Sequence, residues 1–241
     1  MANLLIEIGN TALKAAWSEG MTLGKTFRYQ GEKFIEFIFS ITEKEKPEVM
    51  AVASSRAVTP SEENKLKDRC GTLILLDSGH REALGGWSLP EYLSCDRAAA
   101  LVAAGWLFKG KDITVFDFGT TLTVDSIAAD GKYLGGNISP GCRTRFKALN
   151  RYSRTLPLVN TPSDPPVTGT SLQGSIEAGV ISGIMFEIEG YMRLHPGNTV
   201  VFTGGDAIYF AKKMKNSIFV VCNLVLMGLA LITEDYVGNK S

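Results

Sequence analysis

Short apolar runs separated by polar turns open the chain and predict β-strands. Asn3 to Ile8 form the first run, which ends at Gly9-Asn10-Thr11, and Leu13 to Trp17 and Thr22 to Tyr29 follow as two more. Runs of this length between segments that contain glycine are typical of strands in a hairpin or meander. We therefore predict a three-stranded meander over the first 29 residues.

Helical and strand patterns then alternate as far as residue 108. Apolar side chains recur at helical spacing within Glu32 to Lys46, and Pro47 marks the end of that predicted helix. The next predicted elements are a strand, a helix, a strand and an Ala-rich helix, over Val49 to Ala53, Pro60 to Lys67, Thr72 to Leu76 and Ser94 to Phe108.

The second half repeats this order of elements. Predicted strands lie at Ile113 to Asp117, Thr121 to Ile127, Lys132 to Leu134, Thr199 to Thr203 and Ser217 to Val221. Predicted helices lie near Arg143 to Asn150, over Leu172 to Leu194, from Asp206, and over Leu224 to Tyr236. With the two adjacent helical segments, Arg143 to Asn150 and Leu172 to Leu194, counted as one helical region, both halves have the pattern βββαβαβα.

A pentapeptide match supports an internal duplication. Glu7-Ile8-Gly9-Asn10-Thr11 and Asp117-Phe118-Gly119-Thr120-Thr121 each follow the first strand of their half. Because repeated elements indicate repeated structural units, we predict an α/β protein with two duplicated domains, residues 1–110 and 111–241, that face each other across a cleft.

Composition and charge narrow the classes of partner. Hydrophobic residues make up 45% of the 241 residues, and 25 Lys and Arg balance 25 Asp and Glu. Such a balance gives no global field toward nucleic acid or anionic lipid. The longest apolar stretch, Leu224 to Ile232, is too short to span a bilayer. We expect a cytoplasmic protein with a small-molecule partner, no nucleic acid and no membrane.

The sequence has few of the residues that metal sites and catalytic thiols need. The four cysteines are scattered without a close Cys-x-x-Cys spacing, and there are two histidines. Reduced thiols are the default expectation for such cysteines in a cytosolic protein.

The two glycine turns are candidate phosphate sites. An acidic residue, a spacer, glycine and then Thr or Asn can direct backbone N–H groups at a phosphate while the carboxylate faces a cation. A plain hairpin turn would use the same residues for conformational reasons. The recurrence of the pattern at equivalent positions favours phosphate binding.

A third glycine motif, Thr203-Gly204-Gly205-Asp206, lies between a predicted strand and a helix. Free amides at a helix start and a close backbone approach would suit an adenine or ribose. Taken alone, the motif is equally a tight turn with Asp206 as the N-cap.

The order and spacing of these motifs resemble the type III pantothenate kinases, the Bvg accessory factor-like proteins of the acetate and sugar kinase/actin superfamily. The resemblance covers most of the chain, and its domains would be ribonuclease H-like, as in actin-like ATPases. The motifs that carry it are Glu7 to Thr11 with Lys14, Asp96-Arg97, Asp117 to Thr120, Gly135 to Gly141, Leu156-Pro157, Gly179, Thr203 to Asp206 and Leu226 to Leu229.

The resemblance implies that ATP phosphorylates the 4′-hydroxyl of pantothenate, the first step of coenzyme A biosynthesis, with Asp96 as the general base. A carboxylate at a helix start lies at the positive end of the helix dipole, which favours its charged form. Without the resemblance, Asp96 would be interpreted as an N-cap. The residues implied to bind pantothenate are Trp87, Ser94, Cys95, Asp96, Arg97 and Ser171.

The same resemblance implies the other ligands and the assembly. Mg²⁺ would accompany ATP, Asp117 would hold a monovalent cation, K⁺ or NH₄⁺, and the protein would be a homodimer. The residues implied to contact ATP are Glu7, Ile8, Gly9, Asn10, Thr11, Ala12, Leu13, Lys14, Thr120, Gly204 and Gly205.

Four positions depart from the family pattern where chemistry is expected. Glu7 stands where the family has aspartate, Ser94 replaces a glycine and Trp87 replaces a tyrosine. Leu172 replaces a threonine, although Thr170 and Ser171 precede it and a local slip would restore the hydroxyl.

Three alternatives stay open at this point. The first is a kinase or phosphatase of the same superfamily that acts on another small hydroxyl or carboxyl compound. The second is a non-catalytic regulatory protein that keeps the fold and binds nucleotide. The third is a thiol enzyme that uses Cys95, whose thiolate a helix start would stabilise.

Overall fold

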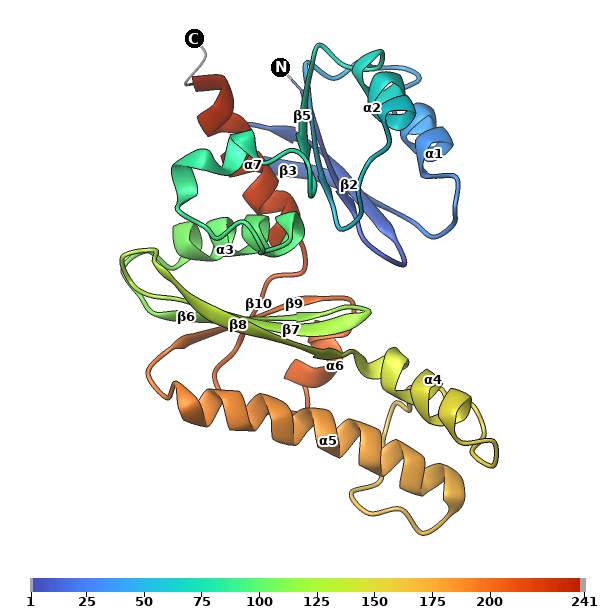
Figure 1. Ribbon diagram of the computed structural model, residues 1–241. Helices are drawn as coiled ribbons and strands as arrows, with labels where there is room; N and C mark the ends of the chain where they lie inside the picture. Colours follow the sequence, from blue (N-terminus) through green and yellow to red (C-terminus); the bar gives the residue numbers. More distant parts are fainter. Residues whose placement is uncertain (1, 239–241) are drawn as a thin grey trace. The chain divides into compact units, whose positions relative to one another are not determined.

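The computed structural model describes residues 2–238 and contains two five-stranded sheets with helices packed on them (Figure 1). The chain forms two compact units. Unit 1 combines the chain up to Lys109 with Gly131–Tyr133 and the segment from Asn223 onward, and unit 2 comprises Gly110–Asp130 and Leu134–Cys222. Each unit is described by itself below.

The sheet of unit 1 has the order β3-β2-β1-β4-β5. Its strands are β1 (Asn3–Ile8), β2 (Leu13–Glu19), β3 (Thr22–Tyr29), β4 (Val49–Ser54) and β5 (Thr72–Leu76). The first three strands pair antiparallel, whereas β1 with β4 and β4 with β5 pair parallel. The predicted meander and both later strands are thus confirmed.

Both faces of this sheet are covered over β1 and β4, which explains why these two strands are nearly continuous apolar runs. Successive residues of a strand point to opposite faces. On one face, Leu4, Ile6 and Met50 join the core beneath α1 (Phe34–Ile41) and α2 (Pro60–Lys67). On the other face, α7 (Leu224–Gly238) packs on β1 and β4, and α3 (Cys95–Leu107) packs on β4.

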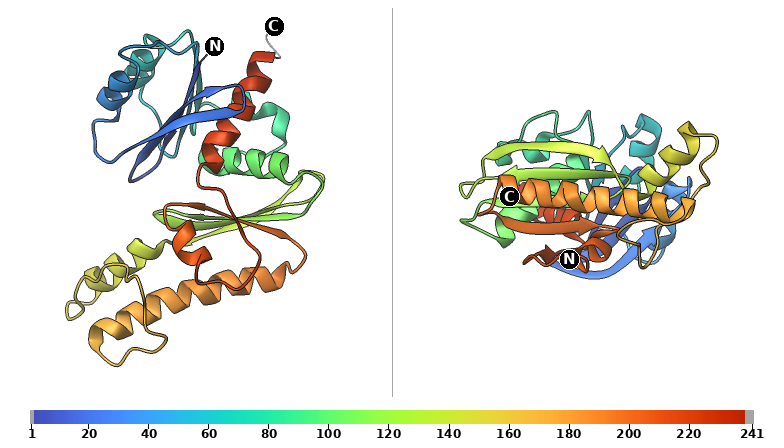
Figure 2. Two further views of the ribbon diagram at one scale, coloured as in Figure 1. Left: turned by 180° about the vertical axis from the view of Figure 1, so that it is seen from behind. Right: turned by 90° about the horizontal axis from the view of Figure 1, so that it is seen from below.

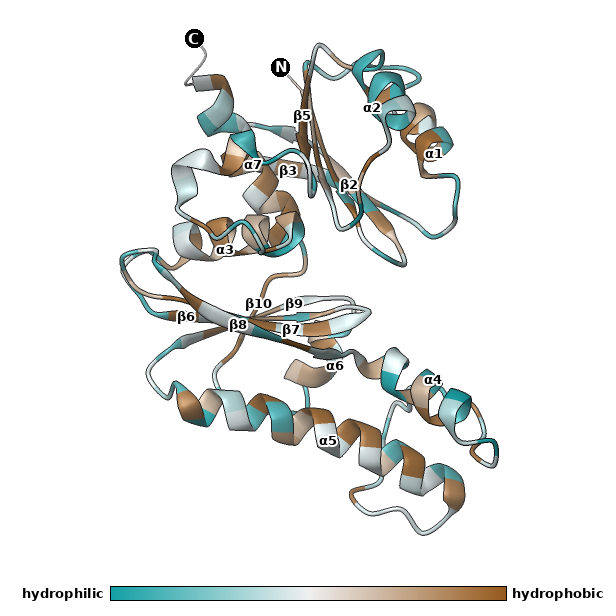
Figure 3. Cartoon of the chain, in the orientation of Figure 1, coloured by the Kyte–Doolittle hydropathy of each residue, from teal (hydrophilic) through white to brown (hydrophobic). Residues whose placement is uncertain are grey.

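Helix α2 has its predicted bounds because both ends carry local signals. The Thr59 hydroxyl accepts from the Glu62 amide and the Glu62 carboxylate accepts from the Thr59 amide, with Pro60 in the first turn. This capping box satisfies N–H groups that the helix leaves unpaired. Figure 3 colours this helix mainly hydrophilic, consistent with its one buried residue, Leu66.

Helix α1 is shorter than predicted at both ends. It ends at Ile41, where the Thr42 hydroxyl and amide both donate to the carbonyl of Ile38. The charged residues that follow, 43–46, offer no apolar side chain to the core, so the helical pattern ends before Pro47. The prediction also missed η1 (Glu82–Trp87), a 3₁₀ segment without apolar periodicity.

The sheet of unit 2 has the order β8-β7-β6-β9-β10, equivalent to that of unit 1. Its strands are β6 (Ile113–Phe118), β7 (Thr121–Ile127), β8 (Tyr133–Pro140), β9 (Thr199–Gly204) and β10 (Phe219–Val220). β6 pairs antiparallel with β7 and parallel with β9, and β9 pairs parallel with β10. The two units are therefore duplicated ribonuclease H-like domains.

Helix α5 (Leu172–Leu194) lies along one face of this second sheet (Figures 1 and 2). Its Ile176, Ile181 and Ile188 belong to the same hydrophobic core as Phe116 and Phe202. Helices α4 (Cys142–Tyr152) and α6 (Ala207–Ala211) contribute Phe146 and Phe210 to the same core. Strand β8 is longer than predicted, because it continues through the glycine-rich segment after Leu134, where Gly135 adopts a positive φ of 127° that favours glycine.

Packing divides the chain differently from the order of the repeats. Unit 2 begins at Gly110, close to the predicted division, but α7 lies in unit 1. Helices α3 and α7 pack so closely that a Cβ on Gly228 would come within 1.8 Å of the Ala99 carbonyl oxygen. Alanine and glycine at this crossing permit near contact of the two backbones. The division of the chain into two duplicated domains, residues 1–110 and 111–241, stays a prediction.

Candidate active site

The hairpin between β1 and β2 holds eight of the eleven residues predicted to contact ATP, Glu7 to Lys14. The Gly9 amide donates to the Ala12 carbonyl over 3.0 Å, and the strands pair at Ile8 and Leu13. Ser55, which follows β4, donates from its amide and hydroxyl to the Ile8 carbonyl over 3.0 Å and 3.2 Å. The turn is therefore fixed to the carboxyl end of the parallel strand β4.

Glu7 and Lys14 are paired across this hairpin. The Lys14 ammonium lies 3.5 Å from the Glu7 carboxylate, and the Glu7 side chain is 16% exposed. Burial raises the pKa of Glu7, Lys14 works against that rise, and the nearby charge of Asp96 adds to it. The carboxylates of Glu7 and Asp96 are thus electrostatic neighbours within unit 1.

Asp96 lies in the first turn of α3, after Ser94 at the N-cap position. The Ser94 side chain makes no capping hydrogen bond. Within residues 2–238, Asp96 Oδ1 and Trp87 Nε1 are buried without a hydrogen-bond partner. An unpaired buried polar atom costs about 1–3 kcal/mol, and a catalytic or ligand-binding role is one explanation for such an atom in a native structure. Asp96 offers an acceptor, and Trp87 offers a donor.

The neighbours of Asp96 in α3 are buried and differ in character. Arg97 is 8% exposed, and its Nη2 donates to the Tyr133 hydroxyl over 3.4 Å. Burial raises the pKa of Cys95 to about 11, although the Arg81 charge opposes this rise. Cys95 is therefore a neutral thiol near pH 7, which argues against the thiol-enzyme alternative.

Sequence reasoning missed two residues beside this helix start, Asp77 and Arg81. The buried Asp77 carboxylate accepts from the amides of Val58 and Gly79, each over 2.8 Å, and of His80 over 3.0 Å. The Arg81 guanidinium donates to the Leu93 carbonyl over 2.7 Å. These partners lie up to 19 positions away in the chain, so no local motif reveals them.

In unit 2 the predicted residues gather at the carboxyl ends of the parallel strands β6 and β9. Asp117 pairs with Thr203 and Phe118 with Gly204. Gly204 has φ 91°, and a Cβ there would come within 2.4 Å of an Asp117 carboxylate oxygen. Glycine is required by both conformation and space. At Gly205, by contrast, a Cβ would meet only the Phe118 carbonyl, at 3.9 Å.

The second glycine turn is held from another side by the start of α4. The Thr120 carbonyl accepts from the Gly141 amide over 3.0 Å and from the Thr144 hydroxyl over 2.6 Å. A Cβ on Gly141 would come within 2.2 Å of the Gly119 carbonyl. The backbone of this turn is thus supported by a glycine from a later segment.

Ser171, predicted to bind substrate, is the N-cap of α5. Its hydroxyl accepts from the Gly174 amide over 3.0 Å. Leu172, the departure beside it, is 56% exposed. The hydroxyl thus has a structural function in this unit, and its role toward substrate stays a prediction.

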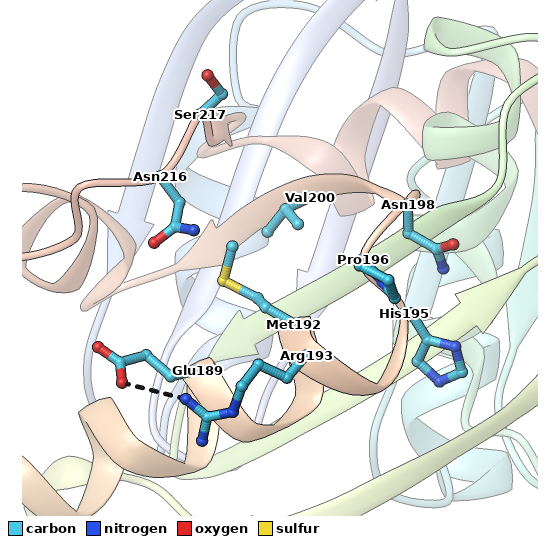
Figure 4. A pocket seen from close by; sticks show the side chains of 9 residues that line it. All are labelled: Glu189, Met192, Arg193, His195, Pro196, Asn198, Val200, Asn216 and Ser217. Carbon is cyan, nitrogen blue, oxygen red and sulfur yellow. Dashed lines mark ion pairs between the residues drawn. The ribbon is translucent and has the colours of Figure 1, made fainter.

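Residues 2–238 contain no group of three or more His, Cys, Asp or Glu side chains placed to hold a metal ion. A cavity of about 520 Å³ in unit 2 is lined by Arg193, His195 and Asn198 among others (Figure 4). It contains none of the residues predicted to bind a ligand.

Between residues 2 and 238, none of the helices is both long enough and apolar enough to cross a bilayer.

The family model for type III pantothenate kinase matches residues 3–194 of this chain. A type III pantothenate kinase from Phocaeicola vulgatus is 38% identical over 234 residues, which cover 94% of this chain and 96% of the relative. The chain belongs to the type III pantothenate kinase family. The match includes the Glu7 to Lys14 hairpin, Asp96, Asp117 and Ser171.

Solved structures give the same fold. A Baf family protein from Campylobacter jejuni has a TM-score of 0.64 at 23% identity and covers 98% of this chain and 99% of its own. MreB5 of Spiroplasma citri, solved bound to ADP, has a TM-score of 0.54 at 13% identity and covers 99% of this chain and 98% of its own. At these identities the likeness shows the fold alone, that of the actin-like ATPases.

Proposed function

We propose that this protein transfers the γ-phosphoryl group of ATP to the 4′-hydroxyl of pantothenate and so begins coenzyme A biosynthesis in the cytoplasm. The observation that carries the proposal is the Asp96 oxygen, buried without a partner at the start of α3 beside Glu7 of the glycine hairpin. The family membership supplies the substrate class.

In this proposal Asp96 is the general base. Its carboxylate accepts the proton of the 4′-hydroxyl as that oxygen bonds to the γ-phosphorus, and the bond from phosphorus to the ADP oxygen breaks. Positioning and charge neutralisation dominate phosphoryl transfer, and a base adds a smaller factor. The unpaired Asp96 Oδ1 fits this role because it needs a donor, and an alcohol supplies one.

Trp87 fits a second contact with pantothenate. Its Nε1–H can only donate, so its partner must be an acceptor such as a carbonyl or carboxylate oxygen. Pantothenate carries both kinds of group, hydroxyl donors and carbonyl acceptors. Ser94, Cys95, Arg97 and Ser171 complete the assignment for this substrate.

ATP contacts are assigned to Glu7 through Lys14 in unit 1 and to Thr120, Gly204 and Gly205 in unit 2. Mg²⁺ bound with the nucleotide would neutralise the phosphate oxygens. The Glu7 carboxylate would accept hydrogen bonds from the water shell of this metal, which needs few protein ligands of its own. The Lys14 ammonium would instead pair with the phosphate oxygens.

We assign the monovalent cation, K⁺ or NH₄⁺, to Asp117. Its carboxylate lies beside the backbone of Gly204 at the ends of β6 and β9, and oxygen ligands suit such hard cations. The same proposal includes a homodimer, as the family resemblance implies.

The direct test uses the purified protein with ATP, Mg²⁺, K⁺ and pantothenate, and detects 4′-phosphopantothenate by mass spectrometry. ADP release with other small alcohols, in a substrate panel, tests the alternative kinase. Absence of phosphopantothenate under all cation conditions, with ATP binding intact by calorimetry, would contradict the proposal and favour a nucleotide-binding regulator.

A further inference from the structure

Arg81 joins three groups of the segment that leads into α3. Its Nη1 donates to the Leu93 carbonyl over 2.7 Å and to the Cys95 sulfur over 3.4 Å, and its Nη2 donates to the Pro90 carbonyl over 3.3 Å. Charged donors make stronger hydrogen bonds than neutral ones. One guanidinium therefore ties both ends of residues 90–95 together, one residue before Asp96.

Cys95 connects this segment to the end of β5 from the other side. Its thiol donates to the Asp77 carbonyl over 3.4 Å while its sulfur accepts from Arg81. Asp77 is itself fixed, because its carboxylate accepts three backbone amides and is 2% exposed. Sulfur hydrogen bonds are weak individually, but here they close a chain from the sheet to the helix start.

We call the hydrogen bonds of Arg81 to Pro90, Leu93 and Cys95 the Arg81 clamp. One of its partners, Leu93, is held in place because its side chain is fully buried. The first turn of α3 is otherwise poorly secured by side chains, because Ser94 makes no capping hydrogen bond. A typical N-cap contributes about 1 kcal/mol to the stability of a helix start. The hydrogen bonds of Arg81 therefore restrain this helix start in place of a capping side chain.

We propose that Arg81 is a positioning residue, which holds residues 90–95 and thereby fixes the Asp96 carboxylate for proton transfer. The inference rests on the proposed function for the role of Asp96, whereas the clamp itself stands on the contacts of Arg81. A misplacement of about 1 Å can cost roughly 100-fold in rate. Loss of the clamp should therefore lower kcat more than it alters substrate affinity.

The kinetic test compares Arg81→Met with wild type and with Arg69→Met. Arg69 is a matched control, because its guanidinium packs on the Phe39 ring at 4.2 Å. We expect kcat of Arg81→Met to fall about 10- to 100-fold, with the KM for pantothenate changed less than about threefold. Arg81→Lys should lose less, because its ammonium can still donate to the Leu93 carbonyl.

A second measurement does not depend on turnover. Hydrogen–deuterium exchange should become faster over residues 89–97 in Arg81→Met and stay at the wild-type rate in α2 and in Arg69→Met. If wild type makes no phosphopantothenate, the proposed function fails while this exchange still tests the clamp. Unchanged exchange, or a kcat equal to wild type, would overturn the inference. Should Arg81→Met not fold, Arg81→Lys and Cys95→Ala carry the same comparison.

Discussion

At the scale of single residues, the site is defined by polar atoms that lack partners inside the protein. Asp96 Oδ1 and Trp87 Nε1 are buried without one in residues 2–238, whereas Asp77 at the end of β5 has its carboxylate fully engaged. Ionised carboxylates only accept hydrogen bonds and indoles only donate them. The first two residues are thus suited to a ligand and the third to the scaffold.

Replacing Asp96 by Asn should abolish the base without changing its size. We expect Asp96→Asn to lower kcat by about 100-fold or more, while the Kd for ATP stays within about threefold by calorimetry. Asp68→Asn, at the C-cap of α2, is the control. Turnover of Asp96→Asn near the wild-type rate would mean that this carboxylate is not the base.

Replacing Trp87 by Phe keeps an aromatic ring and removes the indole N–H. One hydrogen bond contributes about 0.5–1.5 kcal/mol, so we expect the KM for pantothenate to rise about 3- to 10-fold with kcat little changed. Trp106→Phe, at a tryptophan 52% exposed in α3, should leave KM unaltered. If the KM of Trp87→Phe for pantothenate equals that of wild type, the indole N–H does not bind the substrate and the ring only packs in the protein.

At the scale of elements, α3 is the part of the fold that connects packing to chemistry. Its alanines, Ala98, Ala99, Ala103 and Ala104 among them, are buried, and its first turn carries Asp96. Small side chains let α7 approach, and this approach anchors α3 against the sheet of unit 1. The position of Asp96 is thus supported by a helix that ends the described chain.

The crossing of α3 and α7 predicts a large effect of one methyl group. Gly228→Ala would place a Cβ 1.8 Å from the Ala99 carbonyl oxygen, and overpacking of this kind costs about 1–3 kcal/mol. We expect its free energy of unfolding to fall by about that amount in urea titrations. Gly190→Ala in α5, where a Cβ meets nothing within 4 Å, should instead stabilise by about 0.5–1 kcal/mol. Equal stability of Gly228→Ala and wild type would contradict the packing described.

At the scale of the whole molecule, the two units repeat one sheet topology and differ in their turns. Between the last paired residues of the two strands lie residues 9–12 in unit 1 and 119–121 in unit 2, so the first connection is one residue longer. The duplication therefore preserved the order of strands and altered the turns. The contacts of these turns with phosphate stay predictions, as does a cleft between the units.

The stability of the whole chain should depend on pH through His80. Its Nδ1 lies 2.9 Å from the Asp77 carboxylate, and this hydrogen bond raises the pKa of His80 above its ordinary value of 6.5. A raised folded-state pKa means that the stabilisation is complete below pH 6.5 and is lost as pH rises through the folded value. In wild type, the free energy of unfolding should therefore fall as the pH rises from 6.5 through the raised pKa of His80.

His80→Gln should lose this slope, because glutamine does not titrate. His195→Gln provides the comparison at the other histidine and should keep the slope. Urea titrations between pH 5.5 and about 8.5 measure both. A wild-type slope retained in His80→Gln would show that another group titrates.

The sequence by itself determined the elements whose signals are local. Short runs between turn residues predicted β1, β3 and β7, and the predicted bounds of α2 agree with the structure, where Thr59 and Glu62 form its capping box. The glycine hairpin was also recognisable, because the residues of its motif are adjacent in the chain, whereas Asp96 was recognised through the family resemblance. The ends of α1 and β8 could not be predicted from the sequence, because local helix or strand propensity competes there with contacts between residues that are distant in sequence.

Only the tertiary structure decided the placement of α7 in unit 1 and the engagement of Arg81 with residues 90–95. It also distinguished the satisfied Asp77 from Asp96, whose Oδ1 has no partner in the described chain. The physical reason is that burial and hydrogen bonding depend on which atoms meet after the chain folds. A sequence pattern states what a residue can do, and its neighbours in space decide which of those roles remains open.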